Sequence, residues 1–203
     1  MSLGSRVSNL KSPSLSVMDD LEIAVAAARA GGAIVRDGFA QSVTPEYKRQ
    51  FDPVTATDHS SEAVVLSLIA EHRPNDAILA EERGGTIPEG RLWIVDPLDG
   101  TVNFVHGIPQ ISVSVALWEG ARPLVGVIYD PLRDECFSAA TGHGAHLNGR
   151  PIRVSPVESL DRSVAATGFP YDHGEFADEY AQVVGAVLAS VNGIRRFGSA
   201  ALD

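Results

Sequence analysis

Apolar residues recur at helical spacing in three parts of the chain. The first series predicts a helix over residues 19–39, which begins at a capping-box-like stretch, residues 16–19. The Gly31-Gly32 pair inside it indicates close packing or a bend, because a nucleotide-binding loop needs a preceding strand and a further spaced glycine.

The second series predicts a helix that Pro74 ends and that has Thr57 or Asp58 as its N-cap. Its apolar face consists of Val64, Val65, Leu68 and Ile69. By propensity alone Asp58 is a plain cap, which contributes about 1 kcal/mol to helix stability.

The third series has the most regular spacing in the chain and predicts an amphipathic helix that ends at Asn192-Gly193. Its apolar positions are Tyr180, Val183, Val184, Val187, Leu188 and Val191. Residues 194–197 follow as a predicted strand, and Gly198-Ser199-Ala200-Ala201 opens a further predicted helix.

Short apolar or alternating runs between these helices predict strands. They are residues 77–80, 92–95, 111–117, 124–129 and 135–139, the later ones forming an antiparallel meander with turns at 130–134 and 148–149. Residues 111–117 alternate between apolar and small polar side chains, which is typical of a strand with one face on the core. Helix pairs that alternate with mixed strands predict an α+β layered sandwich.

Composition narrows the class of protein. With 203 residues, of which 44% are hydrophobic, the chain can bury a core and hold one or two domains. Its net charge of −10 disfavours a phosphate-backbone partner, so no nucleic acid is expected.

The single cysteine, Cys136, excludes an internal disulfide and is predicted to be buried. Residues 1–17 are polar and Ser-rich, with no apolar run for a signal or a membrane span, so we expect a cytoplasmic protein without a membrane partner.

Two carboxylates follow the predicted strand at 92–95. Asp96 ends the strand and Pro97 interrupts its ladder. Gly100 can adopt backbone angles that let Asp96, Asp99 and the Leu98 carbonyl surround one small volume. Clustered oxygen ligands at a strand end suit Mg²⁺.

A second pair of carboxylates, Glu81-Glu82, follows the predicted strand at 77–80. Adjacent side chains on an extended segment point in opposite directions, so at most one of the two is expected to face a given cation.

Other interpretations of the Asp-Pro-x-Asp-Gly stretch compete with a metal site. A capped turn is the more frequent explanation for an isolated Asp-Gly pair. An EF-hand loop is excluded because the acidic residues are not at alternate positions. Phosphatases with an aspartyl nucleophile carry Asp-x-Asp after a strand, whereas this chain has Asp-x-x-Asp.

Taken in order, four motifs make the chain similar to the inositol monophosphatase family over roughly residues 20–203. They are Asp52-Pro53-Val54-Thr55-Ala56-Thr57-Asp58, the pair Glu81-Glu82, the run from Trp93 to Phe104, and Gly198-Ser199-Ala200-Ala201. The resemblance implies the αβαβα fold of the sugar phosphatases. Residues 18–147 would form the metal-binding domain, and residues 148–203 part of a second domain that carries a substrate rim.

The resemblance also implies roles for individual residues. Glu81, Asp96 and the Leu98 carbonyl would hold one Mg²⁺, Asp96 and Asp99 a second, and Glu82 would lie outside the first shell of ligands. Asp58 and Thr101 would take a proton from the attacking water. The implied substrate contacts are Leu98, Asp99, Gly100, Thr101, Gly198, Ser199 and Ala200.

The implied activity is Mg²⁺-dependent hydrolysis of a small phosphate monoester, inositol 1-phosphate, by a homodimer. Two alternatives remain open: a histidinol-phosphate phosphatase, which uses nearly the same motifs, and a catalytically silent Mg²⁺-binding regulator. The substrate would be a phosphorylated polyol or amino alcohol. The family's W-D-x-A-x-G motif, whose Asp binds the second metal, has no counterpart in these 203 residues, so by resemblance the second metal site and half of the substrate pocket are incomplete in this chain.

Overall fold

A seven-stranded sheet forms the centre of the computed structural model, which describes residues 19–39, 41, 44–87, 89–171 and 173–203. In spatial order its strands are β3 (Ala77–Ala80), β4 (Arg91–Asp99), β5 (Ser112–Glu119), β6 (Arg122–Asp130), β7 (Glu135–Ala140), β8 (Gly144–Leu147) and β9 (Arg150–Ile152). Only the β3–β4 pair is parallel, and every later pair in this sheet is antiparallel. The predicted strands and the meander are therefore confirmed.

Both edges of this sheet are short. Strand β9 contains Pro151, which lies opposite His146. At the other edge the chain after β3 folds back, so that Ala80 and Gly84 exchange backbone hydrogen bonds.

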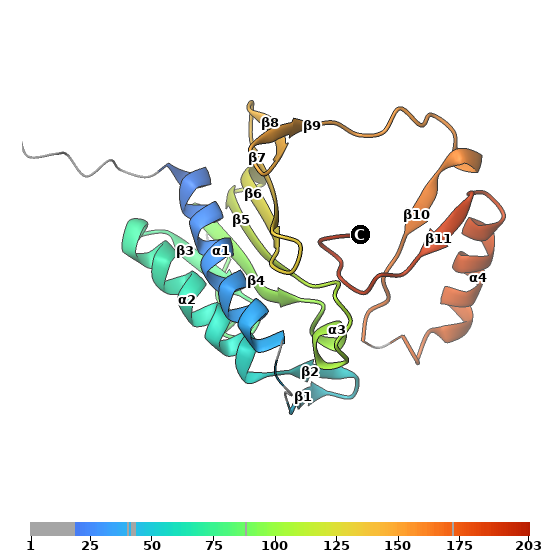
Figure 1. Cartoon of the computed structure of the whole chain (residues 1–203), viewed down its shortest axis with the longest axis horizontal. Coiled ribbons are helices and arrows are strands. Elements are labelled where there is room, and N and C mark those ends of the chain that lie inside the picture. The colour runs from blue at the N-terminus through green and yellow to red at the C-terminus, as the bar shows by residue number, and fades with distance from the viewer. Residues whose placement is uncertain (1–18, 40, 42–43, 88, 172) are drawn as a thin grey trace, which may run out of the picture.

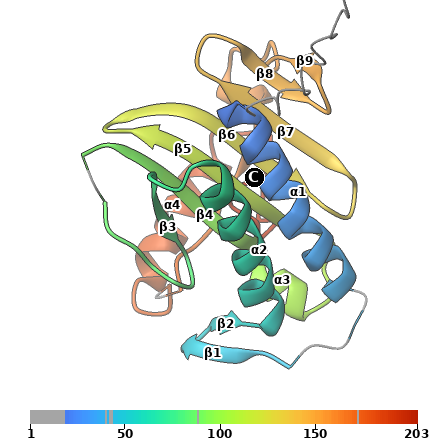
Figure 2. The same cartoon turned by 90° about the vertical axis from the view of Figure 1, so that its left-hand side faces the viewer.

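Helices α1 (Asp20–Phe39) and α2 (Ala56–His72) lie side by side on one face of the sheet (Figures 1 and 2). The predicted close packing of the glycine pair is confirmed. A Cβ added at Gly31 would lie 2.7 Å from Ser61 Oγ, and one at Gly32 would lie 2.4 Å from the Tyr129 ring. The core beneath the helices includes Ile23, Ala27, Val35, Val65, Ile69, Trp93, Val113, Val115, Leu117 and the predicted buried Cys136.

The helix starts differ in part from the sequence prediction. Asp19 and Glu22 form a reciprocal capping pair at the start of α1, whereas residues 16–18 lie outside the described residues. For α2 the predicted cap was wrong: Thr55 is the N-cap, and Asp58 is the third helical residue, whose carboxylate accepts the Thr55 backbone N–H. This arrangement is a capping box, and it turns the Asp58 side chain inward.

Strand β4 continues past Pro97, so the prediction that it ends at Asp96 was wrong. Asp96 pairs with Ser114 and Asp99 with Ser112, so two residues of β4 lie opposite Val113 alone. Such a bulge absorbs the proline, which cannot donate to the ladder, and it re-aims the neighbouring side chains.

Two small elements flank this strand end. The hairpin β1 (Glu46–Arg49) and β2 (Asp52–Val54) precedes α2, and the short helix α3 (Thr101–Val105) directly follows β4. Figure 1 shows β2 and α3 next to each other at the same end of the sheet. The sequence pattern did not indicate this hairpin.

The C-terminal part of the chain forms a second, smaller sheet with one helix. After the 3₁₀ turn η1 (Leu160–Arg162), strands β10 (Val164–Ala166) and β11 (Gly193–Arg195) pair in parallel, with α4 (Ala177–Leu188) connecting them. No residue of α4 is buried. The predicted end of this helix at Asn192-Gly193 was wrong, because the chain turns after Leu188 and the Asn192 N–H donates to Ser163 O beside β10.

The layers follow the predicted α+β order. Figure 1 shows the helix pair, the large sheet, the small sheet and α4 in succession, with residues 199–203 between the two sheets. These last residues form one turn, closed by the Asp203 N–H to the Ser199 carbonyl. The large sheet runs through Ile152, past the expected boundary at 147, and the division into domains remains a prediction. No helix in the described ranges is long and apolar enough to cross a membrane.

Candidate functional site

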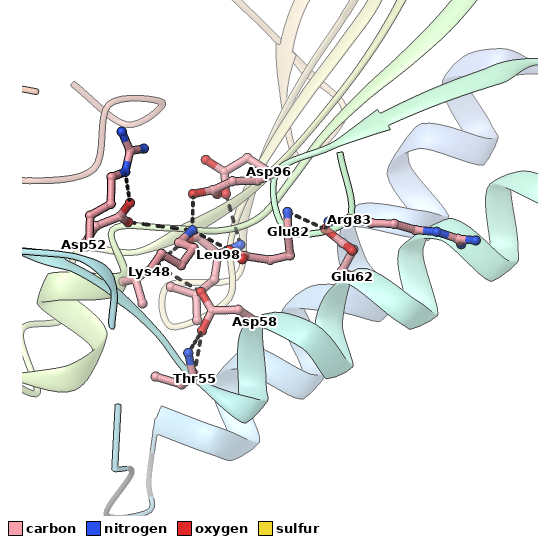
Figure 3. A network of polar contacts seen from close by, with 12 residues as sticks. Lys48, Asp52, Thr55, Asp58, Glu62, Glu82, Arg83, Asp96 and Leu98 are labelled. Carbon is pink, nitrogen blue, oxygen red and sulfur yellow. Dashed lines mark hydrogen bonds and ion pairs between the residues drawn. The ribbon is translucent and has the colours of Figure 1, made fainter. Parts of the chain in front are cut away.

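The carboxylates singled out in the sequence meet at one edge of the sheet. Because β3 and β4 are parallel neighbours, their carboxyl ends place Glu81 and Asp96 together. Figure 3 shows Glu82 and Asp52 joined to the ammonium group of Lys48, with Asp96 nearby at the same edge. The N-terminal end of α2 contributes Asp58 from below the same edge.

Lys48 from β1 is the cation of this cluster. Its Nζ lies 3.1 Å from Glu81 Oε1, 2.9 Å from Glu82 Oε1 and 3.7 Å from Asp52 Oδ1. The expectation that adjacent Glu81 and Glu82 point apart was wrong, since both reach one ammonium group. Strand β3 ends at Ala80, so Glu81 already lies in a turn and the alternation of an extended strand does not apply.

The charge at this edge is unbalanced. Burial, followed by the charges of Glu81 and Asp99, raises the pKa of Asp96 well above its ordinary value. Burial opposes the charge of Lys48, but Glu82 and Glu81 outweigh it and raise the pKa of this ammonium. Lys48 and Arg49, which lies 3.3 Å from Asp52 Oδ2, thus face a larger number of carboxylates, and such a set of hard oxygen donors fits a divalent cation such as Mg²⁺. In the described part of the chain, no three His, Cys, Asp or Glu side chains already converge closely enough to enclose an ion.

Asp58 and Thr101 are in contact, as the resemblance implied. Thr101 Oγ lies 3.0 Å from Asp58 Oδ1 and 3.0 Å from the Leu98 carbonyl oxygen, and all three residues are buried. Burial raises the pKa of Asp58, although hydrogen bonds from Thr55 and Thr101 partly oppose the shift. A hydroxyl has one hydrogen, so donation to Asp58 leaves the Leu98 carbonyl oxygen available to another partner.

Asp99 joins the large sheet to the C-terminal turn. Its Oδ2 accepts from Ser112 Oγ at 2.9 Å, from Ala201 N at 3.0 Å and from Ser199 Oγ, while its Oδ1 accepts from Ala200 N at 2.9 Å. Since a carboxylate oxygen has two lone pairs, Oδ1 is the atom that can still bind a cation.

Two glycines allow this close approach. Gly100 has a φ of 92°, and a Cβ there would lie 2.9 Å from the Gln110 carbonyl oxygen. Gly198 has a φ of 87°, and its Cβ would lie 2.9 Å from the Asn103 amide. The Asn103 amide donates to both the Gln110 and Phe197 carbonyls, at 2.8 and 2.7 Å, and so ties the 198–201 segment to α3.

The structure therefore brings the predicted residues to one place from both ends of the chain. Glu81, Asp96, Leu98, Asp58 and Thr101 form one part, and Asp99 with Gly100 connects it to Gly198, Ser199 and Ala200.

Sequence reasoning missed four polar residues of the site: Lys48, Ser61, Glu62 and Ser112. For Ser61 and Glu62 a signal existed, because they follow Asp58 at helical spacing and share its face of α2.

Comparison with known proteins identifies the family. The sequence profile of the Inositol monophosphatase family matches residues 17–203. The chain belongs to the inositol monophosphatase family. Among similar family members, the inositol-1-monophosphatase of Synechocystis sp. is 44% identical over 187 residues, which cover 90% of this chain and 65% of that protein. The protein of Escherichia coli (strain K12) named Nus factor SuhB is 40% identical over 188 residues, covering 90% of this chain and 70% of the relative.

Solved structures agree with the inositol monophosphatase fold. The inositol monophosphatase of Anabaena superposes with a TM-score of 0.79 at 44% identity, covering 90% of this chain and 68% of that one. The extragenic suppressor protein SuhB of Bartonella henselae gives a TM-score of 0.80 at 39% identity, covering 89% and 71%. The predicted family and α+β fold are thus confirmed, and the similar proteins are longer than these 203 residues.

Proposed function

We propose that the protein is a Mg²⁺-dependent phosphatase that hydrolyses a small phosphate monoester, with inositol 1-phosphate as its substrate. The observation that carries this proposal is the Thr101–Asp58 contact, which lies beside a strand end with an excess of buried carboxylate. A proton acceptor next to a cation-binding group is the arrangement that hydrolysis by an activated water requires.

The residues that would hold Mg²⁺ are Glu81, Asp96, the Leu98 carbonyl and Asp99. The Leu98 N–H donates to Asp96 Oδ1 at 3.1 Å, so the backbone already orients one oxygen of this carboxylate. Bound Mg²⁺ would lower the pKa of a water molecule and neutralise phosphoryl oxygens.

Thr101 and Asp58 would move the proton. The Thr101 hydroxyl can accept a hydrogen bond from water while donating its own hydrogen to Asp58 Oδ1, 3.0 Å away. The raised pKa of Asp58 favours proton acceptance. Asp58 Oδ2 stays anchored to the Thr55 N–H and hydroxyl, so the base keeps its orientation.

The C-terminal segment would hold the leaving group. Gly198, Ser199 and Ala200 are small, which lets hydroxyl groups of a substrate approach their backbone. The Gly100 and Thr101 backbone amides would meet phosphate oxygens. The inositol assignment is favoured by the Synechocystis relative, named inositol-1-monophosphatase.

Phosphate release tests the proposal. The assay uses inositol 1-phosphate and histidinol phosphate over a Mg²⁺ titration. Asp96→Asn protein, purified by the same procedure, is the blank. Because the relatives are longer, it is run on the 203-residue polypeptide and on this polypeptide extended at Asp203 with the corresponding residues of the Synechocystis relative. We expect Mg²⁺-dependent release by the extended polypeptide, with higher kcat/KM for inositol 1-phosphate, and little release by the 203-residue polypeptide. Higher kcat/KM for histidinol phosphate would reassign the substrate.

A second candidate is a role through binding rather than catalysis. It is favoured by the relatives named Nus factor SuhB, at 39 to 40% identity. Mg²⁺ binding without release of phosphate from either substrate, in both polypeptides, would support this candidate over the phosphatase.

A further inference from the structure

Helix α2 buries three polar side chains on the face that meets the strand ends. Asp58, Ser61 and Glu62 are 1%, 0% and 6% exposed, and their spacing of three and four residues places them on one side of the helix. Buried polar groups in an otherwise apolar interface are destabilising unless they are paired, so each of them should have a specific partner. Asp58 binds Thr101, as described, and the other two bind the backbone turns that carry the predicted metal ligands.

Glu62 holds the turn after β3. Its Oε2 accepts the backbone N–H of Glu82 at 2.9 Å and that of Arg83 at 3.3 Å (Figure 3). The N–H of Glu82 belongs to the peptide unit whose carbonyl is that of Glu81. The Glu62 carboxylate therefore fixes the backbone from which the Glu81 side chain leaves.

Ser61 holds the bulge of β4. Its Oγ donates to the Pro97 carbonyl oxygen at 2.8 Å. The same peptide unit carries the Leu98 N–H, which donates to Asp96 Oδ1 at 3.1 Å. Because a peptide unit is planar, the Ser61 hydroxyl sets the plane that orients the Asp96 carboxylate and the start of Leu98.

We propose that Ser61 and Glu62 are positioning residues for divalent-cation binding, which fix the two strand-end turns bearing Glu81, Asp96 and the Leu98 carbonyl. The inference rests on the metal site of the proposed function. Neither side chain is expected to touch the ion or the substrate. A polar group behind a metal ligand typically changes metal affinity about 10- to 100-fold when it is removed.

The test uses variants paired with matched controls on the same helix. Glu62→Gln keeps the side-chain volume but removes the charge that both N–H groups face, and exposed Glu71→Gln is its control. Ser61→Ala removes the hydroxyl from the Pro97 carbonyl. Its control is Ser60→Ala, since the exposed Ser60 hydroxyl donates to the Ala56 carbonyl of the same helix, at 2.8 Å.

Two readouts separate positioning from a general structural role. Titration calorimetry with MgCl₂ should show affinity weakened about 10-fold or more in Glu62→Gln and Ser61→Ala, and unchanged in the two controls. In metal-free protein, amide exchange measured by NMR should accelerate at Glu82 and Arg83 in Glu62→Gln, and at Leu98 in Ser61→Ala. Circular dichroism verifies folding, and since the variants act on different turns, either one that folds is sufficient.

Unchanged Mg²⁺ affinity in every variant that folds would overturn the inference, whatever the Tm of the variant. Failure of the proposed function looks different: wild-type protein would bind Mg²⁺ but release no phosphate, and the affinities of the variants would still decide the roles of Ser61 and Glu62.

Discussion

The surroundings of Asp96 disfavour the charged form of its side chain. Its pKa in the folded protein lies above the ordinary value because of burial and the charges of Glu81 and Asp99. For a carboxyl group with a raised pKa, folding stability is unaffected below the unfolded-state pKa and falls as the pH rises from there to the folded-state pKa. At neutral pH the suppressed ionisation of Asp96 in the folded state therefore lowers the free energy of unfolding, as is common for residues kept for function.

Asp96→Asn should accordingly abolish phosphatase activity and raise the Tm of the metal-free protein. We expect the free energy of unfolding to rise by roughly 1–2 kcal/mol near pH 7.5, allowing for solvent screening, and by less at pH 5. Thermal unfolding with EDTA and with MgCl₂ measures this, and exposed Asp178→Asn is the control. If Mg²⁺ stabilised the Asp96→Asn variant as much as the wild type, Asp96 would not be a metal ligand.

Thr101→Ala should lower kcat by about 10²-fold with little change in KM, because orientation of water matters in the transition state. Asp58→Asn should have a similar effect and should also weaken the cap on α2, by about 1 kcal/mol, since Asp58 is part of the capping box. Steady-state kinetics of the single and double variants provide the check. Losses that simply add in the double variant would show that the two residues do not act as a unit.

At the scale of elements, close packing of α1 depends on its paired glycines. Gly32→Ala should destabilise the protein by about 1–3 kcal/mol, because the new Cβ would lie 2.4 Å from the Tyr129 ring. Gly185→Ala in α4 has open space around the new Cβ and should instead gain up to about 1 kcal/mol from helix propensity. Urea unfolding of the two variants compares them, and a stable Gly32→Ala protein would mean that the helix can shift away from the sheet.

Elements with a local signal could be predicted from the sequence, and elements fixed by distant partners could not. The periodicity of α1 and the alternation of β5 follow from one buried face, so their bounds are nearly correct. The cap of α2 was missed because Thr55, Thr57 and Asp58 are all capable caps, and the contact of Asp58 with Thr101, 43 residues away, selects among the arrangements. The continuation of β4 beyond Pro97 depends on pairing with Ser112.

The candidate site shows the same division. Acidic residues follow two predicted strands, and the family resemblance implied that Glu81 and Asp96 would share one cation. Lys48 carried no comparable signal, because a lysine in a polar segment is usually a solvated surface residue. Its role follows only from the hairpin that folds across the strand ends, where it meets Glu81 and Glu82.

For the molecule as a whole, stability should differ between its two parts. Helix α1 buries seven residues in the main core, whereas no residue of α4 is buried. Local opening free energies follow buried apolar contact, so amides of α4 should exchange much faster than those of α1. Hydrogen exchange with mass spectrometry of the 203-residue polypeptide tests this, and equal protection of the two helices would contradict it.

The edges of the large sheet bear on how the protein behaves at high concentration. An exposed strand edge offers unpaired N–H and C=O groups to a neighbouring molecule and is a common start of aggregation. Here Pro151 removes a hydrogen-bond donor from β9, and the backbone hydrogen bonds between Ala80 and Gly84 cover part of β3. Pro151→Val would restore that donor beside Ile152, which is 39% exposed, so concentrated solutions of this variant should scatter more light while the parent protein stays clear.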